Sequence, residues 1–283
     1  MVVRASKFVK FRLGFFFYLA STGVVIFWLI PFIIAVFTSV KSMDELMVNP
    51  YMWKFPAKWN FGNFLYVWET IGISKYVVNT FIITIPSVIG ALIISSLSAF
   101  ALAFYNFKFN KLILIIFVAG MLIPFQMLMI PVYRFSDQTG LINTYKGVVL
   151  FHITFQLGFC TFFLRNFLKG IPYSIFEAAR VDGASDFEIY YKIILPLSVP
   201  SMAALGVLEF TWIWNDLLWS LVLLQFDALK PVTVGLANMQ GEFITNYNYL
   251  AAGSIIAAAA PLVIFLFFQR YFIEGLTVGA EKG

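Results

Sequence analysis

Six long apolar stretches dominate this sequence and restrict the class of structure that it can adopt. A helix that crosses a bilayer needs about 20 mainly apolar residues. The chain has 283 residues, of which 61% are hydrophobic and 12% charged, against about 25% charged in soluble domains. We therefore expect an all-α polytopic membrane protein with six transmembrane helices. The predicted spans are Leu13–Val40, Tyr76–Phe104, Leu112–Val132, Gly147–Leu164, Leu197–Leu224 and Tyr249–Phe268. The fourth has the weakest signal, because it is short and contains His152 and Gln156.

The first stretch follows four basic residues, as the core of a signal peptide does. Signal cores are about 7–15 residues long, whereas this run continues from Leu13 to Val40, and no small-x-small cleavage pattern follows it. We expect it to be retained as the first transmembrane helix.

The distribution of Lys and Arg predicts the orientation. Six spans place both termini on one side, together with the loops at about 105–111 and 165–196. That side carries twelve of the nineteen basic residues and the other side seven. The positive-inside rule therefore predicts that both termini and the 165–196 loop are cytoplasmic.

A long polar segment, Ser174–Pro196, separates the fourth and fifth predicted spans and must lie at the membrane surface. Ser174 with Glu177, and Ser185 with Glu188, each predict a capping box that opens a short helix. Asp182-Gly183 predicts the turn between the two helices, and Pro196 is expected to end the second. The segment is predicted to form a compact helix-turn-helix.

Catalytic chemistry is not indicated. The sequence has no GxxxxGK[ST] phosphate-binding loop, so we do not expect the chain to hydrolyse ATP by itself. It contains one His and one Cys, which argues against a Cys/His metal site. We expect Cys160 to be a buried packing residue and His152 a satisfied interior histidine, with a role in a transport pathway as the minority alternative.

The formal charge of +5 comes from scattered basic residues, so nucleic acid is not an expected partner.

Two acidic residues, Glu209 and Asp216, lie seven positions apart within the fifth predicted span. On one continuous helix they would face nearly the same way, and carboxylates at membrane depth usually face a bundle interior or an aqueous cavity. A proton-coupled secondary carrier that uses both acids is therefore one hypothesis. Alternatively, Asp216 is solvated or packs near an outer interface. Trp212 and Trp219 share a different face, which would allow an aromatic-lined groove.

The polar segment also carries a specific motif. Glu177-Ala178-Ala179, three residues, Gly183, nine residues, Ile193, one residue and Leu195-Pro196 resemble the EAA loop of the membrane subunits of binding-protein-dependent ABC importers at every defining position. Weaker motifs resemble the MalG-like permeases of the carbohydrate-uptake branch. They are Asn79-Thr80, Ile123-Pro124-Phe125-Gln126 with Ile130-Pro131, Trp214-Asn215-Asp216, Gln269–Phe272, Gly275-Leu276-Thr277 and Gly279–Gly283.

This resemblance implies a set of partners. A second homologous permease would complete a heterodimer, two ATPase subunits would bind ATP and Mg, and an extracytoplasmic solute-binding protein would deliver a sugar. The chain itself would bind no cofactor. Such importers reside in the cytoplasmic (inner) membrane of bacteria or archaea. Residues 1–75 would form an N-terminal transmembrane helix with an outer loop, and residues 76–283 the permease core.

The resemblance also implies roles for individual residues. Gly183 would form the turn, the two alanines would permit close approach of the ATPase, and Glu177 would cap a helix or form a salt link. The tail Gly279–Gly283 would also reach the ATPase interface. The full ATPase-coupling set is Glu177, Ala178, Ala179, Arg180, Asp182, Gly183, Ile193, Leu195 and Pro196. The expected substrate-pathway residues are Asn79, Gln126, Glu209, Trp214, Asn215 and Asp216, and those facing the binding protein are Asn238, Met239, Gln240 and Gly241.

Overall fold

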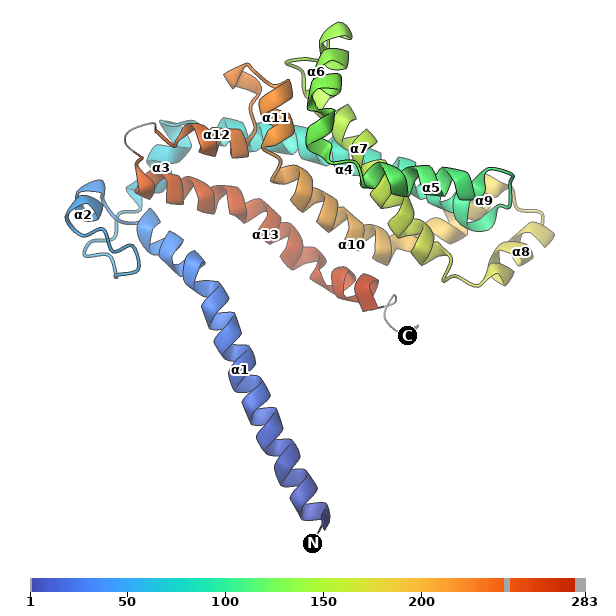
Figure 1. Cartoon of the computed structure of the whole chain (residues 1–283), viewed down its shortest axis with the longest axis horizontal. Helices are drawn as coiled ribbons and strands as arrows, with labels where there is room; N and C mark the ends of the chain where they lie inside the picture. The colour runs from blue at the N-terminus through green and yellow to red at the C-terminus, as the bar shows by residue number, and fades with distance from the viewer. Residues whose placement is uncertain (1, 242–244, 278–283) are drawn as a thin grey trace. The chain divides into compact units, whose positions relative to one another are not determined.

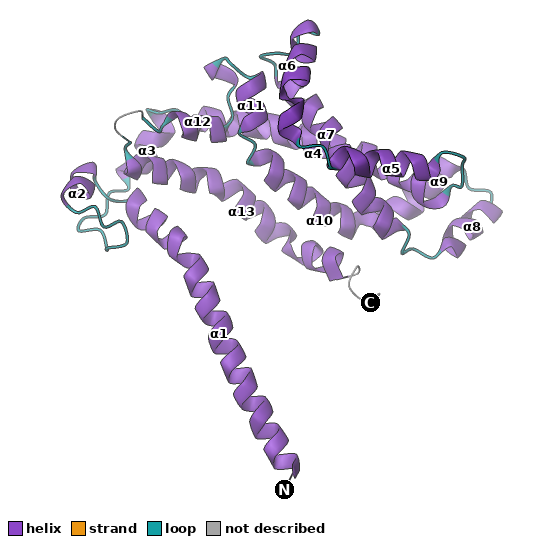
Figure 2. Cartoon of the chain, in the orientation of Figure 1, coloured by secondary structure: helices purple, strands orange, loops and turns teal. Residues whose placement is uncertain are grey.

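A computed structural model describes the backbone of residues 2–241 and 245–277, and the side chains of residues 16–241 and 245–271. Every regular element in these ranges is a helix, as Figure 2 shows. The chain divides into two compact units, residues 1–72 with 239–256 and residues 73–238 with 257–283.

The first unit contains α1 (Val2–Ser39), α2 (Met43–Val48), α3 (Gly62–Glu69) and the start of α13 (Tyr247–Thr277). Buried polar residues join its segments. The amide nitrogen of Asn63 donates hydrogen bonds to the carbonyls of Ser39 at 2.7 Å and Lys41 at 2.8 Å, and the buried Lys41 ammonium donates to the Tyr51 carbonyl at 3.1 Å. These bonds satisfy backbone carbonyls beyond the end of α1 that would otherwise be unpaired.

The second unit is built on three long helices that pack together, α4 (Ile73–Phe104), α7 (Tyr145–Leu168) and α10 (Leu195–Trp214); they are labelled in Figure 1. Small residues permit the close approach of α4 and α7, since a Cβ at Gly90 would lie 2.4 Å from Ile153 Cδ1. The remaining elements are α5 (Asn110–Met121), η1 (Phe125–Leu128), α6 (Met129–Gln138), α8 (Tyr173–Val181), α9 (Asp186–Ile189), η2 (Tyr190–Ile194), α11 (Leu218–Leu223), η3 (Asp227–Leu229), α12 (Val232–Asn238) and the end of α13.

The all-α membrane class is confirmed. Among the described residues, five helices are long and apolar enough to cross a membrane. The predicted third span, Leu112–Val132, is not one straight helix. The helix α5 and the η1–α6 segment meet at a bend of 93°, and the structure has a sixth span only if this bent pair is counted as one. Pro124 lies at the break, where its missing N–H and its restriction of Ile123 disfavour a continuous helix.

The predicted fifth span, Leu197–Leu224, is wrong at its carboxyl end. The helix α10 ends at Trp214, and a separate helix, α11, begins at Leu218. The Asp216 carboxylate accepts hydrogen bonds from the backbone N–H groups of Trp219 at 3.2 Å and Ser220 at 2.9 Å. It therefore stabilises the start of a new helix, and the premise that Glu209 and Asp216 share one helical face fails.

We predict that Gly147→Ala destabilises the protein. The start of α7 approaches the backbone so closely that a Cβ at Gly147 would lie 2.3 Å from the Leu141 carbonyl oxygen, which is backbone and cannot rotate away. The control is Gly120→Ala in α5, where a Cβ meets nothing within 4 Å and alanine raises helix propensity by about 1 kcal/mol. Thermal unfolding of the detergent-purified protein should show a lower Tm for Gly147→Ala and an equal or higher Tm for the control. An unchanged Tm for Gly147→Ala would contradict this packing.

Candidate functional site

The EAA-like segment forms two helices, as the sequence predicts, but the first begins earlier than expected. The helix α8 starts at Tyr173, directly after Pro172, and has no side-chain cap. Ser174 is therefore already inside the helix, and the capping box predicted for Ser174 and Glu177 is wrong. The box predicted for Ser185 and Glu188 is confirmed at the start of α9, where both reciprocal hydrogen bonds are present.

The turn between the helices depends on Gly183. Its φ is +82°, a left-handed conformation that glycine adopts without the steric cost of a Cβ. The Gly183 N–H bonds the Arg180 carbonyl at 3.0 Å, and the Ala184 N–H bonds the Ala179 carbonyl at 3.0 Å. This pair of bonds is the Schellman motif, so Gly183 satisfies the last carbonyls of α8 and reverses the chain.

The second helix of the segment continues into the membrane-length helix. A π-helical turn, η2, joins α9 to α10, and the Leu195 N–H bonds the carbonyl of Tyr190 five residues back. Pro196 is the second residue of α10, directly after this π turn. The prediction that Pro196 ends this helix is wrong, because residues 186–214 form one apolar helical rod.

One face of the segment packs into the core of the second unit. The side chains of Phe176 and Ala179 are buried among residues of α4 and α7. Phe176 stacks on Phe104 with ring centroids 5.1 Å apart, and the Tyr190 hydroxyl is 2.7 Å from that of Ser96. The segment is therefore an anchored part of the fold.

Arg180 links the two short helices across the turn. Its guanidinium lies 3.0 Å from the Asp186 carboxylate and stacks over the ring of Phe176 at 4.9 Å. It also covers the ring of Tyr105, which follows α4. Burial, reinforced by the Asp186 carboxylate, raises the pKa of Tyr105 to about 12, so this ring stays neutral beside the ion pair.

The opposite face of the segment is exposed and partly apolar. Glu177 and Ala178 lie on it, together with three large apolar side chains that the sequence analysis did not single out. Val181 is 87% exposed, Phe187 70% and Tyr191 60%. Exposed apolar residues clustered beside a polar motif are typical of a protein-binding surface. Their alternation with charged residues was the signal available in the sequence. The other expected coupling residues are half-buried (Ile193, Leu195) or exposed (Asp182, Pro196).

Two expected pathway residues are engaged in intrachain hydrogen bonds. The buried Asn79 amide nitrogen donates to the carbonyls of Ala228 and Lys230 at 3.0 and 2.9 Å, and its oxygen accepts from the Tyr145 hydroxyl at 2.7 Å. The indole N–H of the buried Trp214 donates to the Ala257 carbonyl at 3.0 Å. Both side chains therefore hold segments of the second unit together.

The two acids both contact α7, at separate places. The buried Glu209 accepts a hydrogen bond from the Cys160 thiol at 3.2 Å, and its second carboxyl oxygen has no partner among the described residues. The Asp216 carboxylate lies 3.7 Å from Nε2 of His152, a contact that the sequence separation of 64 residues concealed. Cys160 is a buried residue, as predicted.

The remaining predicted residues are accessible. Gln126 lies in η1, and Asn215 follows α10, where its amide donates to the Thr211 carbonyl at 2.8 Å. Asn238 is the last residue of α12, and Met239, Gln240 and Gly241 follow it, with all but the half-buried Met239 exposed. The tail Gly279–Gly283 lies outside the described residues.

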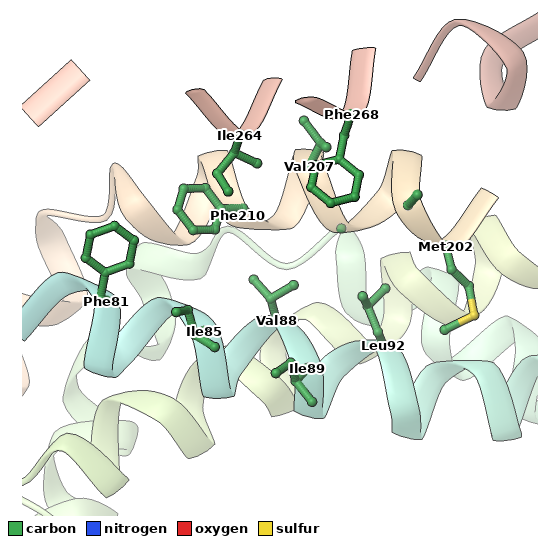
Figure 3. Close-up of a pocket in the computed structure, with 12 residues that line it drawn as sticks. Phe81, Ile85, Val88, Ile89, Leu92, Met202, Val207, Phe210, Ile264 and Phe268 are labelled. Carbon is green, nitrogen blue, oxygen red and sulfur yellow. The ribbon is translucent and has the colours of Figure 1, made fainter. Parts of the chain in front are cut away.

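A wholly apolar groove of about 380 Å³ runs between α4, α10 and the end of α13 (Figure 3). Phe81 and Leu92 of α4 face Phe210 and Met202 of α10 across it, with Phe268 of α13 beside them. No polar side chain lines it. The described side chains of this lining are all apolar, a composition that suits hydrocarbon better than a hydroxylated solute.

Comparison with known proteins identifies the family. Residues 91–277 match the family described as "Binding-protein-dependent transport system inner membrane component". The chain is 35% identical to the arabinooligosaccharides transport system permease protein AraQ of Halalkalibacterium halodurans over 89% of this chain and 91% of that protein. It is 34% identical to the melibiose/raffinose/stachyose import permease protein MelC of Bacillus subtilis over 90% and 91%.

A solved structure shares the fold. One chain of a bacterial ABC transporter involved in the import of the acidic polysaccharide alginate superposes with a TM-score of 0.80 at 22% identity, covering 92% of this chain and 96% of that one.

These findings support an ABC importer subunit over the proton-coupled carrier that Glu209 and Asp216 suggested. The family match covers the packed helices α7 and α10 and the helix-turn-helix between them. Members of this family are transport components and not enzymes. The chain belongs to the inner membrane components of binding-protein-dependent transport systems, the permease subunits of ABC importers.

Proposed function

We propose that this chain is the transmembrane permease subunit of an ATP-driven, binding-protein-dependent importer of neutral oligosaccharides. It would form half of the translocation pathway and couple to a partner ATPase through the helix-turn-helix at residues 173–194. The observation that carries the proposal is the two-faced packing of this segment: Phe176 and Ala179 anchor it, while Glu177, Ala178 and Phe187 remain exposed.

The substrate class rests on the relatives. AraQ and MelC, each matched over about nine-tenths of this chain, are named for arabinooligosaccharides and for melibiose, raffinose and stachyose. All of these are short, uncharged oligosaccharides. A substrate of the same chemical class is the simplest assignment for this chain.

The continuity of α9, η2 and α10 supports a mechanism of coupling. A rigid helical connection transmits displacement better than a loop does, and a π turn is a frequent site of functional adjustment in helices. Movement of an ATPase against the exposed face of α8 and α9 would shift α10 through η2. The stacked rings of Phe176 and Phe104 would carry the same movement to α4.

The assembly would contain further subunits. A second homologous permease would complete the pathway, and two ATPase subunits would bind the ATP and Mg that this chain does not bind. An extracytoplasmic solute-binding protein would contact the turn at Asn238–Gly241, whose exposed polar residues suit a transient interface. Both termini and the helix-turn-helix would be cytoplasmic, as the twelve-to-seven division of basic residues indicates.

Energy coupling distinguishes this proposal from a secondary carrier. In proteoliposomes that hold the whole importer, uptake of a radiolabelled oligosaccharide such as raffinose should require internal ATP and stop with vanadate. It should be unchanged by an uncoupler, because no proton gradient drives it. Uptake that collapses with the uncoupler and ignores vanadate would overturn the proposal.

The Gly183 turn offers a test of the coupling segment. A β-branched residue is strongly disfavoured at a φ of +82°, whereas asparagine tolerates it. A Cβ at Gly183 meets nothing within 4 Å, so neither variant introduces a steric clash at Cβ within this chain, and the two differ in backbone strain. We expect Gly183→Val to lower ATP-dependent uptake by about tenfold or more, since strain of about 1–3 kcal/mol opposes the turn. Gly183→Asn should retain most uptake. Equal uptake by both variants would argue against a role of this turn in coupling.

Two phenylalanines of the segment differ sharply in burial, so their alanine variants can be compared directly. Phe176 is 1% exposed and Phe187 70% exposed. We expect Phe187→Ala to leave the Tm of the permease unchanged but to weaken ATPase binding by about tenfold, the loss of an apolar interface anchor. Phe176→Ala should instead lower the Tm, because it leaves a cavity in the core. Co-purification with the ATPase and thermal unfolding measure the two effects. Normal ATPase binding by Phe187→Ala would place the docking surface elsewhere.

A further inference from the structure

A second cavity, of about 270 Å³, differs in chemistry from the apolar groove. It lies between α7, η1, α11 and the end of α10 within the second unit, and it combines aromatic rings with polar side chains. The residues that line it are Phe125, Phe151, His152, Phe155, Gln156, Trp212, Asp216 and Trp219. Aromatic walls with a few convergent polar groups are typical of small-molecule sites.

An unsatisfied nitrogen marks one end of this cavity. His152 is 5% exposed, and its Nε2 has no hydrogen-bond partner among the described residues. The Asp216 carboxylate, at 3.7 Å, is too far for a direct bond. It is held in place by the hydroxyl and backbone N–H of Ser220, each at 2.9 Å. A hydroxyl group can donate and accept at once, so a ligand hydroxyl could bond both His152 and Asp216.

The aromatic residues provide surfaces for an apolar sugar face. The rings of Phe151 and Trp219 lie 3.8 Å apart between centroids, and Phe151 stacks on Phe155 at 5.5 Å. Trp212 is 48% exposed, and its ring packs against that of Phe159 with ring centroids 5.0 Å apart. Its large ring therefore has a free surface although its position is fixed. The half-buried Gln156 adds an amide donor and acceptor.

The charge of the lining restricts the ligand. Among the described residues that line the cavity, Asp216 is the one acid, His152 is its one basic neighbour, and there is neither Lys nor Arg. Without Lys or Arg, the lining has no permanent positive charge to pair with an anionic ligand. The cavity is also slightly smaller than the roughly 300 Å³ at which drug-sized sites begin, so it suits one sugar ring.

We propose that this cavity is a subsite of this permease for one ring of a neutral oligosaccharide. Trp212 would cover the face of the ring, and Gln156, His152 and Asp216 would bond its hydroxyls. This inference rests on the proposed function and assigns substrate contacts to this subunit. Of the pathway residues expected from the sequence it retains Asp216, and it leaves out Asn79 and Trp214, which are engaged within the fold.

The test uses the whole importer, with its ATPase and binding protein, in proteoliposomes. Trp212→Ala and Gln156→Ala remove accessible groups, and we expect each to lower the initial uptake of radiolabelled raffinose or arabinotriose by about tenfold or more. Stimulation of ATP hydrolysis by the sugar-loaded binding protein should stay within twofold, because the coupling segment is untouched. The controls Phe162→Ala and Thr154→Ala change exposed residues of α7 outside this cavity and should transport normally.

The outcomes separate the two proposals. Uptake by both cavity variants within twofold of wild type would overturn the subsite and leave the proposed function standing. Absence of ATP-driven uptake of either sugar by the wild-type importer would overturn the proposed function itself. Import of an alginate trisaccharide at a comparable rate would overturn the restriction to neutral sugars.

Discussion

The burial of Phe176 against the end of α4 is the contact on which the EAA-like segment depends. A polar helix-turn-helix between two membrane-length helices has little reason to hold a fixed orientation on its own, since short helices are marginal in water. The ring of Phe176 lies among those of Phe104, Tyr105 and Tyr173. With this face buried, the residues on the other side are necessarily presented outward. The exposed motif is therefore a consequence of core packing.

Backbone hydrogen bonding explains why the helices end where they do. In a membrane protein each break leaves carbonyls and N–H groups that must find partners. At the end of α8 Gly183 closes a Schellman motif, and at the start of α11 the Asp216 carboxylate accepts from two N–H groups. The Asn79 side-chain amide likewise donates hydrogen bonds to the carbonyls of Ala228 and Lys230. Polar residues within apolar sequence thus first satisfy the backbone of the fold.

The sequence predicts those helices whose position depends on local signals, such as apolar length or a capping box. Apolar length predicted α4, α7 and α13 closely, and Ser185 with Glu188 predicted the start of α9. Prediction from the sequence failed where contacts between distant segments determine a helix end or bring two side chains together. Hydropathy continued past Trp214, so the end of α10 was invisible without the bonds of Asp216. The proximity of His152 to Asp216 arises from the packing of α7 against α10 and α11, which no spacing along the chain reveals.

Two of the cavities in the second unit show how the lining chemistry separates possible occupants. The groove between α4, α10 and α13 is larger, but its lining can offer only dispersion and apolar burial. The cavity at His152 is smaller, yet it contains a buried nitrogen that has no hydrogen-bond partner in the described part of the chain, beside a carboxylate held by Ser220. Leaving such a group unpaired costs about 1–3 kcal/mol, which a hydroxylated ligand would recover and a hydrocarbon would not. Among the described lining residues, His152 is the one basic neighbour of this carboxylate, and neither Lys nor Arg is present, so the proposed subsite favours neutral sugars over acidic ones.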